Sequence, residues 1–173
     1  MHIDRRLALI SAAAGGMILL AGCGAPATSG SGTPTTAPTV AATPNAALAL
    51  ATAAVAFSAA DTTLVAAYNA QIVIQNAATA GSPKLPAAIN AEIAAETAFD
   101  TAIRAIDTTG LPASVGADIT ALLAADSNVE NAQGTLAVNT TYVSNYNAEF
   151  NIAAAAENAV TAATTTLSNA LGG

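Results

Sequence analysis

Acidic side chains are the main groups in this sequence that could carry out chemistry. Ten carboxylates lie between Asp61 and Glu157, whereas the only histidine is His2 and the only cysteine is Cys23. Large apolar residues recur with alternating spacings of four and three, which places them on one face of a helix. Five acids share this pattern and are therefore predicted to point inward: Asp61, Glu92, Glu96, Asp126 and Glu157.

Counting back from each predicted turn brings Glu92 or Glu96, Asp126 and Glu157 to a similar level of the bundle. Inward carboxylates at one level of a helical bundle are typical of carboxylate-bridged metal sites. Such sites normally include a Glu-x-x-His element on two helices, which this chain lacks. A site made of oxygen ligands alone would favour a hard ion such as Ca²⁺ or Mg²⁺. The weak metal candidates are Glu92, Glu96, Asp126 and Glu157. A site would require carboxylates from three helices within about 5 Å of a common point, and we expect neither a metal nor another cofactor.

The favoured interpretation, however, places the acids at loosely packed or exposed positions, or supposes that the predicted rotation of the helices is wrong by a third of a turn. Six alanines form a face of their own on the predicted second helix: Ala91, Ala94, Ala95, Ala98, Ala102 and Ala105. If that face is the buried one, Glu92 and Glu96 move to its wet border. Asp100 and Arg104 are four residues apart and are predicted to form a surface ion pair.

No group of residues is suited to nucleophilic catalysis. Lys84 is predicted to lie alone in a turn, and the many serines and threonines have no neighbouring base to activate them. The sequence also lacks a glycine-rich phosphate loop and a redox motif. We therefore expect no enzymatic activity.

The first 22 residues have the features of a secretory signal. Arg5 and Arg6 precede a short apolar stretch from Leu7 to Leu20. The following Leu20-Ala21-Gly22-Cys23 resembles the lipobox of bacterial lipoproteins. That resemblance implies cleavage between Gly22 and Cys23 and acylation of the Cys23 thiol. Two or three acyl chains make a stable anchor, which predicts a location on the outer face of the cytoplasmic membrane.

The charge of the chain limits its partners. From Cys23 onward, two cations and ten carboxylates give a net charge of −8. No basic patch is present to neutralise phosphates, so nucleic acid is not expected as a partner. Docking onto anionic lipid is excluded for the same reason, and the predicted membrane contact is the lipid anchor alone.

Residues 23–44 are predicted to form a tether, and residues 45–173 a helical domain. The tether has four prolines and no periodic apolar pattern. The rest is dominated by alanine, the best helix former, and the whole chain contains 49 alanines but only 3% aromatic residues. No run approaches the roughly 20 strongly apolar residues that a membrane-spanning helix needs.

Prolines and glycines divide the domain into segments that predict four helices. The first covers about 45–79, the second runs from Pro86 to before residue 108, the third begins after Pro112, and the fourth ends near Leu171. The third and fourth are predicted to meet near residues 139–141, where the side chains can cap a helix, with residues 126–128 as the competing break. Short loops predict an all-α, up-down-up-down four-helix bundle. The predicted inward residues are Leu50, Phe57, Leu64, Tyr68, Leu85, Ile89, Phe99, Ile103, Ile106, Val115, Ile119, Leu122, Val129, Leu136, Val143, Tyr146, Phe150, Val160, Leu167 and Leu171.

The second half of the chain resembles a group of Ala-rich actinobacterial lipoproteins of unknown function. The matching segments are residues 99–106, 111–118, 122–126 and 167–172. This resemblance implies a compartment and no activity.

Two functions remain compatible with the sequence. The first is a non-enzymatic envelope protein that binds a partner or supports surface structure through an exposed helix face. The alternative is a carrier of a small apolar ligand or a divalent cation between the helices, because small side chains leave space for a pocket.

Overall fold

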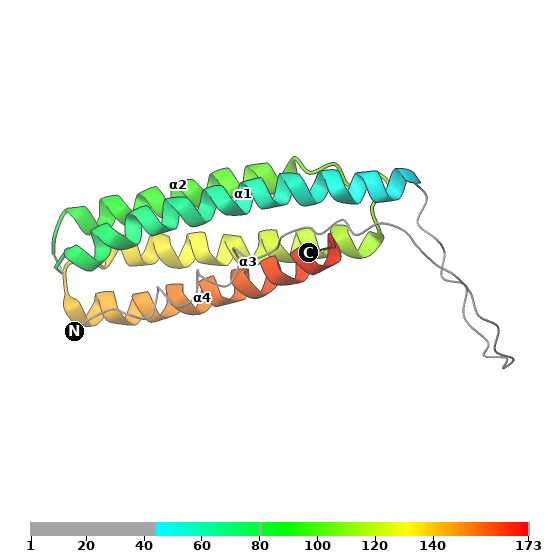
Figure 1. Cartoon of the computed structure of the whole chain (residues 1–173). Helices are drawn as coiled ribbons and strands as arrows, with labels where there is room; N and C mark the ends of the chain where they lie inside the picture. Colours follow the sequence, from blue (N-terminus) through cyan, green and yellow to red (C-terminus); the bar gives the residue numbers. More distant parts are fainter. Residues whose placement is uncertain (1–43, 80, 173) are drawn as a thin grey trace, which may run out of the picture.

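The structure, a computed structural model, describes residues 44–79 and 81–172. This part of the chain forms four α-helices and has no β-strand. The helices are α1 (Pro44–Ala77), α2 (Lys84–Arg104), α3 (Ala113–Val138) and α4 (Val143–Ala170). Figure 1 shows each helix running back along the one before it, with the pair α1 and α2 lying along the pair α3 and α4. The prediction of an all-α, four-helix domain is confirmed. The predicted signal peptide, Cys23 and the tether up to residue 43 lie outside the described residues.

The break between α3 and α4 falls at residues 139–142, where the sequence predicts it. The competing break at residues 126–128 is wrong, because these residues lie inside α3. The predicted capping is also wrong, since α4 follows Tyr142 and has no side-chain cap. Thr140 is instead buried, and its carbonyl oxygen accepts a hydrogen bond of 2.8 Å from the Gly81 N–H. This bond joins the two turns at one end of the bundle.

The second helix begins two residues earlier than predicted, at Lys84. Lys84 therefore belongs to the first turn of α2 and not to the preceding loop. Pro86 is tolerated as the third helical residue, because N–H groups in the first turn have no partner within the helix. Gly81 and Gly110 have φ angles of +82° and +79° in the loops on either side of α2, a left-handed conformation that favours glycine.

Buried apolar residues form two clusters along the bundle. The smaller cluster lies near the two joined turns and contains Leu85, Ile89, Leu136, Tyr146 and Ala153. The larger cluster fills the other half and contains Ala53, Phe57, Ala60, Leu64, Phe99, Ile103, Ile106, Val115, Ile119, Leu122, Val129, Val160, Leu167 and Leu171. Most predicted inward residues are in one of these clusters. The prediction is wrong for Val143, which is 62% exposed because it lies at the first position of α4.

The first helix differs from the other three in polarity. By length and composition alone, α1 could cross a membrane, and it is the one described helix with this property. The sequence did not lead us to expect this, because alanine and β-branched residues raise hydropathy without a run of large side chains. In the bundle, its inner face supplies Phe57 and Leu64 to the larger cluster, whereas Leu48 and Val55 are exposed. Asp61 is the single charged residue among its 34 residues.

Candidate functional site: a buried carboxylate layer

A group of polar side chains, all of them buried except the half-buried Tyr68, lies between the two apolar clusters. We call it the polar layer, and it consists of Tyr68, Glu92, Glu96, Asp126 and Gln133. Glu92, Asp126 and Gln133 are 0% exposed, and Glu96 is 1% exposed. These acids therefore point inward, as the 4-3 spacing indicates. The favoured interpretation, with Glu92 and Glu96 at the solvent-exposed border of an alanine face, is wrong because the apolar stripe of α2 faces the core and its alanine face does not.

Three helices are connected through the hydroxyl of Tyr68. The side-chain amide of Gln133 on α3 donates a hydrogen bond of 3.1 Å to this hydroxyl. The Tyr68 hydroxyl on α1 in turn donates to Oε1 of Glu96 on α2. This chain of bonds satisfies part of the hydrogen-bonding capacity that burial would otherwise leave unused.

The Glu96 carboxyl retains its proton at neutral pH. Burial raises its pKa to about 11, and the hydrogen bond and negative charge of Asp126 add to this effect. Glu157 and Glu130 raise the pKa of Glu96 further through their charges. An uncharged Glu96 avoids the large cost of placing an unpaired carboxylate in a dry interior.

The Asp126 carboxyl is buried in the same layer and acts on the pKa of Glu96. Among the described residues, neither oxygen of Asp126 accepts a hydrogen bond from an amide, hydroxyl or ammonium group. Burial raises the pKa of Asp126 to about 7; Glu96 acts against this shift, and Asp100 adds to it. The protonation of Glu96 and that of Asp126 therefore depend on each other.

The other two acids predicted to point inward are only partly buried. Glu157 comes from α4, and its charge acts on Glu96, so α2, α3 and α4 all contribute an acid to this region. Asp61 lies on α1, and burial raises its pKa. Within the described part of the chain, however, no three or more acidic, histidine or cysteine side chains are arranged to hold a metal ion.

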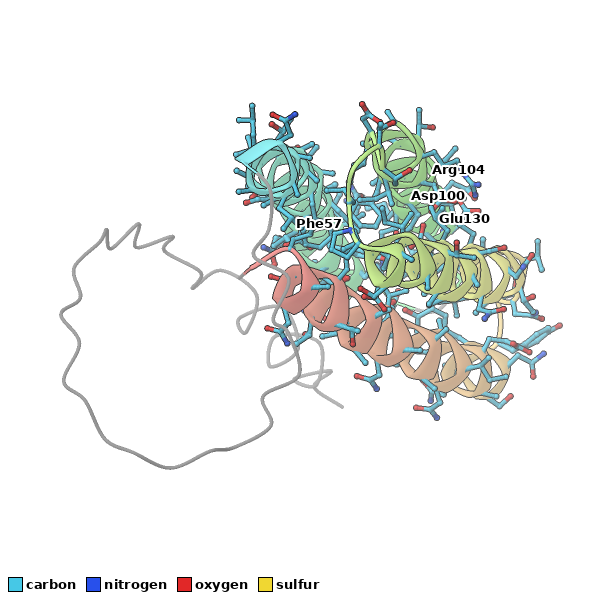
Figure 2. The ribbon with its side chains drawn as sticks, turned by 90° about the vertical axis from the view of Figure 1, so that its right-hand side faces the viewer. Phe57, Asp100, Arg104 and Glu130 are labelled. Atoms are coloured by element: carbon cyan, nitrogen blue, oxygen red, sulfur yellow. The ribbon has the colours of Figure 1, made fainter. Side chains whose placement is uncertain are left out.

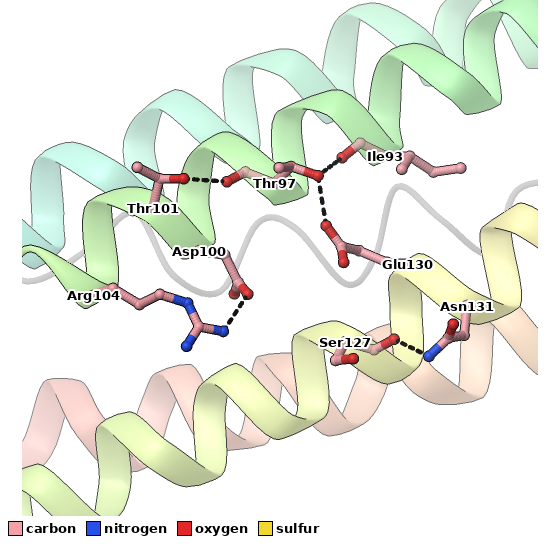
Figure 3. Close-up of polar contacts among 8 residues, drawn as sticks. All are labelled: Ile93, Thr97, Asp100, Thr101, Arg104, Ser127, Glu130 and Asn131. Carbon is pink, nitrogen blue, oxygen red and sulfur yellow. Dashed lines mark hydrogen bonds and ion pairs between the residues drawn. The ribbon is translucent and has the colours of Figure 1, made fainter.

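A second set of polar contacts lies at the outer edge of the layer, between α2 and α3. The predicted pair of Asp100 and Arg104 is confirmed, with Oδ2 and Nη2 separated by 3.1 Å. Thr97 donates a hydrogen bond of 2.7 Å to Glu130, as Figure 3 shows. Arg104 is 63% exposed but Asp100 only 14%, and Asp100 raises the pKa of Asp126. The ion pair is thus the solvent-facing border of the buried layer.

The side chains labelled in Figure 2 distinguish the interior from this border. Phe57 points from α1 toward the inside of the bundle, whereas Asp100, Arg104 and Glu130 lie together beside α2 and α3. The only guanidinium of the described residues therefore reaches the edge of the layer from the solvent side.

Gln133 is the member of the polar layer that the sequence analysis missed. It follows Val129 by four residues and precedes Leu136 by three, so it lies on the inward stripe of α3. The signal was present, but only large apolar and acidic residues were counted.

No family model, no curated protein and no solved structure matches this chain. The resemblance to Ala-rich lipoproteins stays a prediction.

Proposed function

We propose that this protein is a lipid-anchored envelope protein with a non-enzymatic binding or structural role, in which the outer face of α1 contacts a partner. The observation that carries this proposal is the apolar surface of α1. Leu48 is 68% exposed and Val55 is 65% exposed. With a single charge in the whole helix, this face has little polar surface to keep it in water.

The position of the carboxyls supports a role without catalysis. Glu92, Glu96 and Asp126 are the residues best suited to proton transfer, yet they have almost no exposed surface. A catalytic acid or base must come within hydrogen-bonding distance of its substrate. A substrate in solution does not reach these groups while the bundle is intact.

The proposed anchor is the acylated Cys23, which would hold the bundle on the outer face of the cytoplasmic membrane. Between Cys23 and Pro44 lie 20 residues rich in threonine, serine, glycine and proline. A flexible coil of this length spans about 25 Å on average. The bundle would therefore stay close to the membrane and still be free to reorient toward a partner.

Replacing Cys23 tests the anchor. In the native host we expect Cys23→Ala to move the protein from the detergent phase to the aqueous phase, or to leave the precursor unprocessed, because no other thiol is present to be acylated. Ser31→Ala, in the same tether, is the matched control and should partition like the wild type. Detergent partitioning of Cys23→Ala identical to that of the wild type would refute the anchor.

Site-specific photo-crosslinking in cells tests the contact face. We expect a defined adduct from a photo-reactive residue at Val55 and none from one at the exposed Thr120 of α3. Equal labelling from the probes at Val55 and Thr120 would contradict the assignment of this face. So would the absence of any adduct from probes placed at Val55 and, in a second variant, at Leu48.

A further inference from the structure

An open hollow lies between α1 and α2, close to the turn that joins them. Its volume is about 470 Å³, within the range of about 300–1,000 Å³ that is common for small-molecule sites. The walls are mainly apolar. They are formed by Gln71, Val73, Ile74, Ala77, Lys84, Ala87 and Ala88.

Two large apolar side chains are exposed in this hollow. Val73 is 69% exposed and Ile74 is 39% exposed, although β-branched side chains of this size gain free energy on burial. The alanines of α2 opposite them are too short to cover them. A hydrocarbon lying in the hollow would remove this surface from water.

The hollow also contains a positive charge, which is rare in this protein. Lys84 is the only lysine of the chain, and none of the residues that line the hollow carries a carboxylate. Lys84 lies in the first turn of α2, where the positive end of the helix dipole also favours an anion. One cation next to apolar walls is complementary to a molecule with one anionic head and one hydrocarbon tail.

We propose that this hollow binds a long-chain fatty acid, with its carboxylate paired with Lys84 and its hydrocarbon chain lying against Val73, Ile74 and the facing alanines. A neutral lipid would not use the charge of Lys84. A polyanionic ligand would lack further cations, since the described chain has only Arg104 besides Lys84. The site does not depend on acylation of Cys23, so a failure of this proposal would leave the proposed anchor unaffected, and the reverse also holds.

Direct binding of radiolabelled palmitate to the purified full chain, by equilibrium dialysis, tests this site. We expect Lys84→Met to bind about three- to tenfold more weakly, because it removes one ion pair at a partly solvated position, and Lys84→Arg to bind nearly as well as the wild type. Hexadecanol, with the same chain length and no charge, should bind more weakly than palmitate. Measurements on full chain carrying Cys23→Ser should give the same ratios.

Two valines on α1 provide the matched control for the hydrocarbon contact. Val73 is 69% exposed and Val55 is 65% exposed, but only Val73 lines the hollow. We expect Val73→Ser to weaken palmitate binding about three- to tenfold and Val55→Ser to leave it unchanged, with the helical circular dichroism of both variants preserved. Equal affinities for palmitate and hexadecanol, equal losses in the two valine variants, or no binding by the folded wild type would overturn the proposal. A further contrary outcome is that the purified protein is a dimer that dissociates when Val73 is changed to Ser but not when palmitate is added. That result would show that the hollow is occupied by a second copy of the chain.

Discussion

At the scale of single residues, the main feature of the polar layer is that it contains acids but no cationic side chain. Within the described chain the two positive side chains are Lys84, in the first turn of α2, and Arg104, which is 63% exposed. Glu96 and Asp126 therefore face Tyr68, Gln133 and other acids, but no buried positive charge. With no cation nearby, protonation of these carboxyls is the change that removes negative charge from the interior at the lowest free energy.

We expect the domain to be most stable in mild acid and to lose stability as the pH rises. Asp126 has a folded pKa of about 7 against 3.8 for the free group, and Glu96 about 11 against 4.5. Both groups bind protons more tightly in the folded state, so their contribution is complete below about pH 4 and declines through pH 7 for Asp126 and pH 11 for Glu96. Thermal unfolding between pH 4.5 and 9 should show a melting temperature that falls by several degrees.

Amide substitutions test whether the buried carboxyls cause this decrease of stability with pH. Asp126→Asn should flatten the decline between pH 4.5 and 7 and make the domain about 1–3 kcal/mol more stable at pH 8, because an amide carries no charge to desolvate. Asp118→Asn, outside the layer, should keep the wild-type slope. A melting temperature that rises from pH 4.5 to 8 in the wild type would show that these carboxyls are ionised in the folded state.

At the scale of the helices, alanine content and proline positions were sufficient to predict four elements and most of their ends. The 4-3 spacing also predicted the burial of Glu92, Glu96 and Asp126. Counting back from the turns predicted a similar level for Glu96 and Asp126, but whether their side chains meet depends on the rotation of the two helices, which the spacing alone does not determine. The exposure of Val143 was missed for a local reason, since a stripe residue in the first turn lies beyond the packed part of the helix.

Small residues allow α3 and α4 to approach closely, and Ala153 is the position where this is most easily tested. It has no exposed surface and lies in the smaller cluster with Leu136 and Tyr146. Ala153→Leu should destabilise the domain by about 1–3 kcal/mol, because the added carbons have no space. Ala155→Leu on the exposed side of α4 should change stability by less than about 0.5 kcal/mol. Urea unfolding measures both, and similar values for the two variants would show that the contact between α3 and α4 is loosely packed.

At the scale of the whole molecule, polar and apolar surfaces are distributed unevenly. The end with the two joined turns exposes Val138, Tyr142 and Val143, at 79%, 69% and 62%. The fatty-acid hollow lies toward the same end, at the C-terminal part of α1, whereas the proposed tether enters at Pro44, at the other end of this helix. A 34-residue helix is about 51 Å long, so the apolar end can act well away from the anchor.

The polar layer also bears on which alignment of the helices is allowed. A sequence this rich in alanine offers many nearly equivalent ways to slide one helix along another, and a shift of seven residues, about 10 Å, would keep the same faces together. Such a shift of α2 would separate Glu96 from the Tyr68 hydroxyl and from Asp126, and would move unpaired carboxyls into an apolar cluster. A single row of acids thus distinguishes one register from its neighbours, and it does so with groups that on their own would destabilise the core. In a chain this rich in alanine, we therefore expect the polar layer to add to the specificity of the fold.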